Sequence, residues 1–406
     1  MKIFKLALHW QIVIAMVFAF IVSSFVPEVS KYIDWIGKLF LNALSMVVVP
    51  LVLSSIVTSI GSLEHISQLK RIGLKTLALY VFTMLLAILL GLFLVNLIKP
   101  GLGVGLQMMD TQILGSLKTT LSFKDILINI IPSNIFAALS GVNMIGIIFV
   151  AIVLGIFINI SQTETKYVMN RFFIAAYDLT LNITKFIIKL SPIGVFVILL
   201  SQLSNVTDVW QLLGNLGKYF LTVVSGLIFH LFITMSIIMW LFAKVKPWKH
   251  LKNMMTPLIT SFSSASSSAT IPLTMEALED NNGVSRKITS ITIPLGATIN
   301  MNGTALLECV AVLFIAQAYG IELTFVQQII VVITSLLSAI GTAGIPMAGL
   351  VMMAVILNAV GLPIEGIGLV IGVDRILDML RTSVNVYGDT CVAVIVAKSE
   401  GETLKI

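Results

Sequence analysis

Five polar side chains in the last apolar stretch of the chain have the types and spacing to bind a charged ligand. They follow one another at intervals of four, three, four and four residues, which places them on one face of a helix. These are Asp374, Asp378, Arg381, Asn385 and Asp389. The guanidinium of Arg381 offers a planar fork to a carboxylate, while Asp378 can hold an ammonium group. The pattern therefore predicts a site for an acidic amino acid, with a ladder of internal salt bridges as the structural alternative.

A second group of side chains supplies the hard oxygen atoms that small cations prefer. Asn300, Asn385 and Asp389, with backbone carbonyls near Gly296, could hold sodium, which shares with calcium a preference for oxygen donors. Asparagine also caps helix ends at breaks, so a purely structural reading stands beside this one.

Glu308 lies in the apolar run from Leu306 to Val310, with no basic residue near it in sequence. Burial disfavours the charged form of a carboxyl group, so Glu308 could carry a proton. A hydrogen-bonded structural acid is the equally weighted alternative.

The segments that hold these residues are apolar enough to span a membrane, but polar and helix-breaking residues interrupt them. Four such segments follow residue 250: 250–282 with a serine cluster, 287–318 split at Asn300-Met-Asn-Gly303-Thr304, 324–362 split at Gly341-Thr-Ala-Gly344-Ile-Pro346, and 364–397 with the polar face. In hydrocarbon an unpaired peptide group costs several kcal/mol, so a chain turns back only where protein or a wet cavity satisfies it. We therefore predict re-entrant hairpins at 250–282 and 324–362.

An Asn-x-x-Gly pattern occurs in both of the intervening helices, at Asn300 to Gly303 and at Asn385 to Gly388. Two units of a hairpin plus a broken helix are typical of an inverted-repeat transporter with its site at the repeat interface.

The composition places the whole chain in a lipid bilayer. Of its 406 residues 58% are hydrophobic and 11% charged, with a mean hydropathy of +1.05, which is too little polar surface for a soluble protein of this size. Apolar runs predict further helices at 7–26, 33–62, 74–98, 128–161, 166–202 and 212–245. The net charge of +6 is spread over short clusters between these runs, which disfavours nucleic-acid binding and marks cytoplasmic helix ends.

No pattern typical of an enzyme or of a metal centre is present. Only two cysteines, Cys309 and Cys391, occur, both in apolar stretches, and the four histidines are scattered. We expect no cofactor and no catalytic residue, apart from coupling ions, H⁺ or Na⁺ or both.

The motifs together resemble the dicarboxylate/amino acid:cation symporters, which include excitatory glutamate transporters and archaeal aspartate transporters. The matching stretches are Ser266-Ser-Ser268, the breaks at 300–304 and 341–346, and the polar face from Asp374 to Asp389. The resemblance implies a prokaryotic glutamate/aspartate transporter homologue with an all-α fold of eight transmembrane helices plus two re-entrant hairpins. It further implies a multi-pass protein of the cytoplasmic (inner) membrane, a homotrimer and an elevator mechanism.

The resemblance also divides the chain into two bodies. The scaffold or trimerisation domain would comprise 1–62 and 128–202, and the transport domain 74–98 and 212–398.

By the same resemblance, Arg381 would hold the substrate side-chain carboxylate and Asp378 its amino group. The remaining substrate contacts would come from Thr382, Asn385, Thr304, Ser266, Ser267, Ile345 and Gly349. Glu308 matches the proton carrier of the excitatory members, and the second hairpin would be the gate. One sodium site would use Gly296, Asn300, Asn385 and Asp389, and another Thr298, Ala339, Ile340 and Thr342.

The chain departs from the family pattern at two places. Asn302 stands where the family has Asp, and a Thr83-Met84 pair stands where it has Thr-Ser, both at the family's third sodium site. The arginine that the family keeps before the serine run or after Asp378 is absent, since Ala265 and Met379 occupy those positions; Arg375 is the nearby substitute.

Two other functions are weighed against an acidic amino acid symporter. A C4-dicarboxylate:cation symporter would leave Asp378 without an ammonium to hold. An ion channel would line a pore with the charged helix, but paired hairpins disfavour it.

Overall fold

The computed structural model describes residues 8–26, 28–61, 66–104, 131–140, 144–204, 209–342 and 348–406, and these form helices, turns and short connections without a strand. The first half contains α1 (Leu8–Phe25), α2 (Val29–Gly61), α3 (Ile66–Ile98), α6 (Ile135–Ser140), α7 (Met144–Ile160), α8 (Thr163–Lys189) and α9 (Ser191–Ser204). The second half contains α10 (Val209–Phe229), η2 (His230–Thr234), α11 (Met235–Ala243), α12 (Pro247–Asn253), α13 (Met255–Ser264), α14 (Ser267–Ala277), η3 (Leu278–Asn282), α15 (Arg286–Ile299), α16 (Asn302–Ala318), α17 (Phe325–Gly341), α18 (Ala348–Ala359), η4 (Ile364–Gly366) and α19 (Ile367–Ser399).

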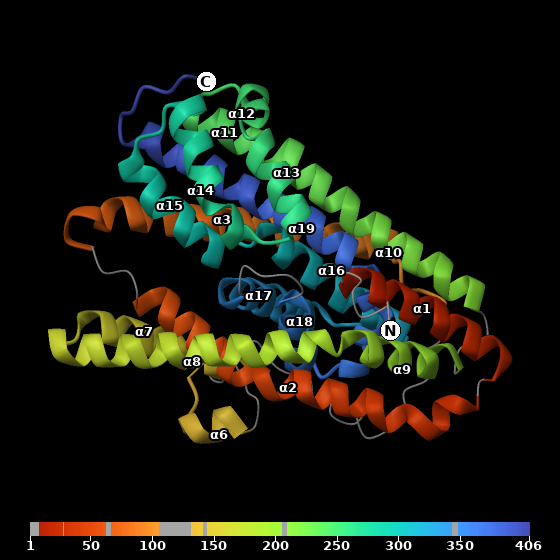
Figure 1. The fold of residues 1–406 in the computed structure, drawn as a ribbon. Coiled ribbons are helices and arrows are strands. Elements are labelled where there is room, and N and C mark those ends of the chain that lie inside the picture. Colours follow the sequence, from red (N-terminus) through yellow and green to blue (C-terminus); the bar gives the residue numbers. More distant parts are fainter. Residues whose placement is uncertain are drawn as a thin grey trace.

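The helices gather into two groups with α17 and α18 between them (Figure 1). In the first group α2 packs on α7, α8 and α9, and α1 packs on α9. In the second group α19 is central and contacts α13, α15 and α16, while α3 packs on α16 and α10. The second group therefore surrounds the helix that carries the polar face.

Several helices differ from the predicted ones at their ends or in their continuity. Helix α3 begins at Ile66 rather than 74, because its first turns contain polar residues that favour helix and need no apolar environment. The predicted helix 166–202 is two helices bent by 56° at Leu190. Pro192, in the first turn of α9, has no N–H to bond and allows the bend without loss.

The first hairpin is a helix, a tight turn and a second helix, as the serine cluster predicts. Helix α13 ends at Ser264, and Ala265 adopts a left-handed conformation with φ of 50°. Ser266 then caps α14 by accepting a hydrogen bond from the N–H of Ala269 at 3.3 Å. Below, "first hairpin" means residues 247–282.

The second hairpin pairs α17 with α18, and its tip at 343–347 lies outside the described residues. Helix α17 begins with a capping box in which Thr324 and Gln327 exchange hydrogen bonds. "Second hairpin" below means residues 325–359.

The tail after α19, residues 400–406, contacts the ends of several helices. Glu400 forms ion pairs with Arg71 and with Lys75 of α3, the latter at 2.7 Å. Glu402 accepts hydrogen bonds from Ser285 just before α15, and the Lys405 N–H donates to Asn282 O at 2.9 Å. The Lys249 ammonium donates to Lys405 O at 2.6 Å. The basic residues near 71, 249 and 286 therefore lie at one end of the protein, as expected if all face the same side of a membrane.

By length and apolarity, the described residues contain three helices able to cross a membrane: Arg71–Ile98, Trp210–Ala243 and Arg286–Ala318. The bent pair α8 and α9 would be a fourth. Shorter apolar helices account for much of the remaining apolar sequence, including α1, α7, α17 and α18. The all-helical class is thus confirmed, and the count of eight helices plus two hairpins stays a prediction.

Candidate functional site

The polar face of α19 is buried. Its five members, Asp374, Asp378, Arg381, Asn385 and Asp389, each expose 3% or less of their surface. Such burial is expensive for charged groups unless they are paired or serve a ligand.

Arg381 and Asp378 form a tight pair at the centre of this face. Nε and Nη2 of Arg381 lie 2.9 and 2.8 Å from Asp378 Oδ1. Arg375, in the preceding turn, places Nη1 3.5 Å from the other carboxylate oxygen of Asp378. The substitute arginine of the sequence analysis thus faces the same aspartate.

One nitrogen of Arg381, Nη1, is buried and has no hydrogen-bond partner among the described residues. Leaving a charged donor unsatisfied costs more than the 1–3 kcal/mol of a neutral group. Two glycines lie closely against Arg381: a Cβ at Gly303 would lie 2.6 Å from its backbone oxygen, and a Cβ at Gly349 would overlap Nη1 of its side chain. An anion that reached Nη1 would therefore meet the second hairpin.

Asn385 connects α19 to the break between α15 and α16. Its Oδ1 accepts the N–H of Gly303 at 2.7 Å, and its Nδ2 donates to Thr304 Oγ1 at 3.1 Å. Thr382 donates its hydroxyl to Asp378 O at 2.7 Å. The structure thus gathers five of the predicted substrate residues around one helix break.

The other predicted substrate residues are less closely connected. Ser266 caps α14, and Ser267 is buried in the first turn of that helix. Gly349 lies against Arg381, and Ile345 lies outside the described residues.

Three of the four residues of the first predicted sodium site meet one turn further along α19. Asn300 Nδ2 donates to Asp389 Oδ1 at 2.8 Å, and a Cβ at Gly296 would overlap that same oxygen. The fourth, Asn385, is turned toward Gly303 and Thr304 instead. A buried carboxylate beside an amide and the end of a helix is a suitable donor set for a monovalent cation.

Next to this group lies a neutral cluster that contains both departures at the family's third sodium site. The Thr83 hydroxyl lies 3.3 Å from Asn302 Oδ1 and 3.5 Å from Asn300 Oδ1. Met84 is fully buried, and its sulfur accepts the N–H of Met301 at 3.4 Å. Asn302 Nδ2 is buried and has no partner among the described residues.

The residues of the second predicted sodium site make local contacts. Thr298 donates to Leu295 O at 3.0 Å, and Thr342 donates to Ser338 O at 2.9 Å. Thr342 also caps α17 through its N–H, which bonds Ala339 O, and Ile340 lies in the last turn of that helix. Helices α15 and α17 pack on each other, which keeps these residues near one another.

Glu308 is fully buried in α16, and neither carboxylate oxygen has a well-formed hydrogen bond with a described residue. Ser338 of the second hairpin carries a described hydroxyl that interacts with this carboxyl group. Asp374 and Arg381 both influence its charge.

Comparison with known protein families identifies the family of this chain. The sequence model of the sodium:dicarboxylate symporter family matches residues 8–399. The chain belongs to the sodium:dicarboxylate symporter family. It is therefore a membrane symporter and not an enzyme.

Individual relatives in the sodium:dicarboxylate symporter family include bacterial and animal proteins. The chain is 34% identical to a proton/sodium-glutamate symport protein of Geobacillus stearothermophilus, over 98% of this chain and 96% of the relative. It is 34% identical to an excitatory amino acid transporter of Caenorhabditis elegans, over 91% of this chain and 82% of the relative. It is also 34% identical to the neutral amino acid transporter B(0) of Mus musculus, over 87% and 72%.

Two features near the symporter's site were not predicted from sequence. The Tyr80 hydroxyl of α3 donates to Thr292 O at 2.7 Å and lies beside the Gly296 position. His250 bonds Thr390 Oγ1 through Nε2 at 2.9 Å and Asn282 through Nδ1 at 2.6 Å. A lone tyrosine in an apolar run, or a lone histidine in a basic stretch, carries no signal of its partner, so spacing alone could not have found either.

Proposed function

We propose that this protein imports acidic amino acids, glutamate or aspartate, coupled to protons, sodium or both. The observation that carries the proposal is Arg381, which is buried, is held by Asp378 on one side, and has one nitrogen, Nη1, without a partner among the described residues. A substrate carboxylate would satisfy Nη1, and Asp378 would hold its ammonium group. Relatives named for glutamate and excitatory amino acid transport support the same substrate class.

Two competing substrates follow from the same site. The neutral amino acid relative shows that the family extends beyond acidic substrates, but a neutral side chain would leave Nη1 unsatisfied. A C4-dicarboxylate would bond Arg381 yet bring no ammonium to Asp378. An ion channel is a weaker candidate, because the polar face is packed against other helices.

The substrate assignment is tested with Arg381→Cys in proteoliposomes. Uptake of labelled glutamate or aspartate should fall by a factor of about 100 or more. The change removes both the buried partner of Asp378 and the donor for the substrate carboxylate, which together cost roughly 3 kcal/mol of substrate binding. Labelled serine should enter instead, and succinate should compete poorly with aspartate in the parent protein. Unchanged aspartate uptake in Arg381→Cys would refute the assignment.

For the coupling ions, Glu308 is the proposed proton carrier. It is buried without a well-formed hydrogen bond to a described residue, and the charge of Arg381 acts on it, so its protonation state and substrate binding should influence each other. Uptake should be driven by a proton gradient alone, and Glu308→Gln should abolish that drive. If sodium alone drives uptake and Glu308→Gln stays active, Glu308 is structural.

The proposed sodium positions are the two sets given above, with Asp389, Asn300 and Gly296 as the better supported one. We propose no third sodium ion, because Asn302 and Thr83 form a neutral cluster and Met84 fills space beside it. Asn302→Asp should introduce a carboxylate that a cation must neutralise. Uptake in this variant should become more steeply dependent on sodium, and unaltered sodium dependence would contradict the idea.

Movement of the substrate across the membrane is proposed to follow an elevator mechanism. The scaffold would comprise 1–62 and 128–202, and the transport body 74–98 and 212–398, with the second hairpin as gate. The packing supports this division, since α2, α7, α8 and α9 contact one another and α3, α10, α16 and α19 form a second cluster. A homotrimer in the cytoplasmic membrane is proposed with it, and cross-linking in native membranes should yield trimers.

A further inference from the structure

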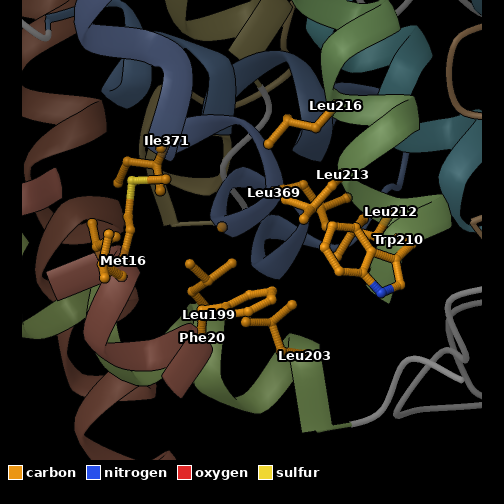
Figure 2. Close-up of a pocket in the computed structure, with 14 residues that line it drawn as sticks. Met16, Phe20, Leu199, Leu203, Trp210, Leu212, Leu213, Leu216, Leu369 and Ile371 are labelled. Atoms are coloured by element: carbon orange, nitrogen blue, oxygen red, sulfur yellow. The ribbon is translucent and has the colours of Figure 1, made fainter. Parts of the chain in front are cut away.

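An apolar cavity of about 320 Å³ lies away from the polar site, between α1, α9, α10 and the beginning of α19. Figure 2 shows Met16 and Phe20 of α1 and Leu199 and Leu203 of α9 facing side chains of α10 and α19 across it. Its volume is at the lower end of the range of ligand pockets, about 300–1,000 Å³. The cavity is therefore large enough to hold part of a small apolar molecule.

The lining excludes every polar ligand class. The described lining side chains carry no carboxylate, hydroxyl, amide or basic group, and the indole N–H of Trp210 is the one hydrogen-bonding group among these described side chains. Apolar cavities of this kind do not hold water and bind hydrocarbon when it is available. Amino acids and ions are thus excluded as occupants.

The mouth of the cavity lies at an exposed apolar surface of the protein. Of its lining residues, Trp210 is 78% exposed and Val17 is 55% exposed. Phe18, the next residue of α1, is 57% exposed, so the surface around the mouth is apolar too. In a membrane protein such a surface faces acyl chains, and Trp at a helix start is typical of the interface where headgroups begin.

The walls of the cavity belong to both proposed bodies. Helices α1 and α9 pack in the scaffold group, and α10 and α19 in the transport group. At its inner edge α19 contacts the scaffold closely, because a Cβ at Gly368 would overlap Ile198 and one at Gly372 would overlap Met16. Sliding of one body along the other therefore changes the shape of the cavity.

We infer that this cavity binds one acyl chain of a membrane phospholipid, and that the bound chain must be released or rearranged each time the transport body moves. The lipid would then set the rate of translocation without touching the substrate site. This second statement rests on the proposed elevator mechanism, whereas lipid binding itself does not.

Binding is tested on the purified full-length protein reconstituted with phosphatidylcholine that carries a photoactivatable diazirine in one acyl chain. Labelled peptides should be concentrated around Leu199 on α9 and Leu216 on α10. Leu216→Trp fills the cavity and should reduce labelling of these peptides several-fold. Leu221→Trp makes the same change at a position of α10 that is 65% exposed, and should leave labelling unchanged.

Labelling spread evenly over all lipid-facing helices, or equal in Leu216→Trp and Leu221→Trp, would overturn the site. Leu199→Phe repeats the filling from the opposite wall, in case Leu216→Trp does not fold to the parent elution profile. Since labelling requires no transport, its outcome is independent of the substrate assignment.

The rate is tested by aspartate uptake in the same vesicles. Both filling variants should alter the maximal velocity several-fold, with the KM for aspartate and the aspartate affinity in detergent unchanged. Loss of labelling with an unchanged velocity would overturn the coupling of the lipid to movement. A velocity change equal in Leu221→Trp would do so as well.

Discussion

The two hairpins approach α19 in different ways. The first hairpin is attached by directed hydrogen bonds: Ser383 donates to Leu258 O at 3.1 Å, and His250 bonds Thr390 at 2.9 Å. Its two arms are joined to each other as well, since Asn253 donates to Asn282 Oδ1 at 2.7 Å. These bonds are lost together if the first hairpin moves.

The described residues of the second hairpin meet the rest of the site mainly by close packing. Gly349 lies against the Arg381 guanidinium, and the α18 segment from Val351 to Leu357 is almost completely buried and apolar. Apolar packing is non-directional and can re-form after a displacement, whereas a broken buried hydrogen bond leaves two unsatisfied groups. The difference favours the second hairpin as the element that opens.

Among changes that test this difference between the hairpins, the largest effect is expected from Gly349→Val. The new Cβ would overlap Arg381 Nη1, so the second hairpin could not close over the substrate. Overpacking of this kind costs about 1–3 kcal/mol, and aspartate affinity should fall by a factor of about 10–100. Gly217→Val, at a helix position with no neighbour within 4 Å of its Cβ, is the matched control for uptake measurements. Normal affinity in Gly349→Val would show that closure does not need this contact.

A smaller effect, on stability rather than affinity, is expected from His250→Phe. The change removes the bonds that the imidazole makes with Asn282 Nδ2 and with the Thr390 hydroxyl at a fully buried position. Unfolding free energy should fall by about 1–3 kcal/mol, measured as a lower midpoint in thermal unfolding of the purified protein. Aspartate affinity should change little, and a large loss of affinity with normal stability would contradict the comparison.

Ser383→Ala should have a lesser effect, because it removes one bond to Leu258 O and a longer one, 3.4 Å, with Ser261. The expected loss is about 0.5–1.5 kcal/mol in the same unfolding measurement. A loss of unfolding free energy as large as that of His250→Phe would mean that the hydrogen bonds of Ser383 and of His250 do not act independently.

The smallest effect is expected at the tail. Hydrogen bonds from Arg71 and Lys75 hold the pKa of Glu400 below its usual value. Because the pKa of Glu400 is lower in the folded state, its ionised form stabilises the folded protein at pH values above the unfolded pKa, near 4.5. This stabilisation is lost as the pH falls through the folded pKa. Glu400→Gln should lower the unfolding midpoint slightly at pH 7 and weaken its dependence on pH below 4.5. If the unfolding midpoint depends equally on pH in the parent and in the variant, groups other than Glu400 cause that dependence.

Much of the arrangement follows from local sequence rules. Ser266 is a good cap after a left-handed residue, and the Asn300 break and the polar face of α19 are visible from spacing alone. These features depend on residues within a few turns of each other, so a single chain reveals them.

What spacing could not supply are contacts between distant elements. Tyr80 meets Thr292 across 212 positions, and Asn385 turns toward Gly303 rather than Asp389 because α16 offers a free N–H there. Such pairings depend on how helices cross, and no periodicity in either segment encodes the partner.

The tail also bears on how the protein is made. Arg71 and Glu400 are 329 residues apart, so α3 must be in place long before α19 and its tail leave the ribosome. Contacts with so large a sequence separation form late and slowly, since closing the long loop precedes any stabilisation from it. During synthesis the beginning of α3 therefore remains without its partner Glu400. The Glu400 ion pairs can form only as one of the last steps of assembly.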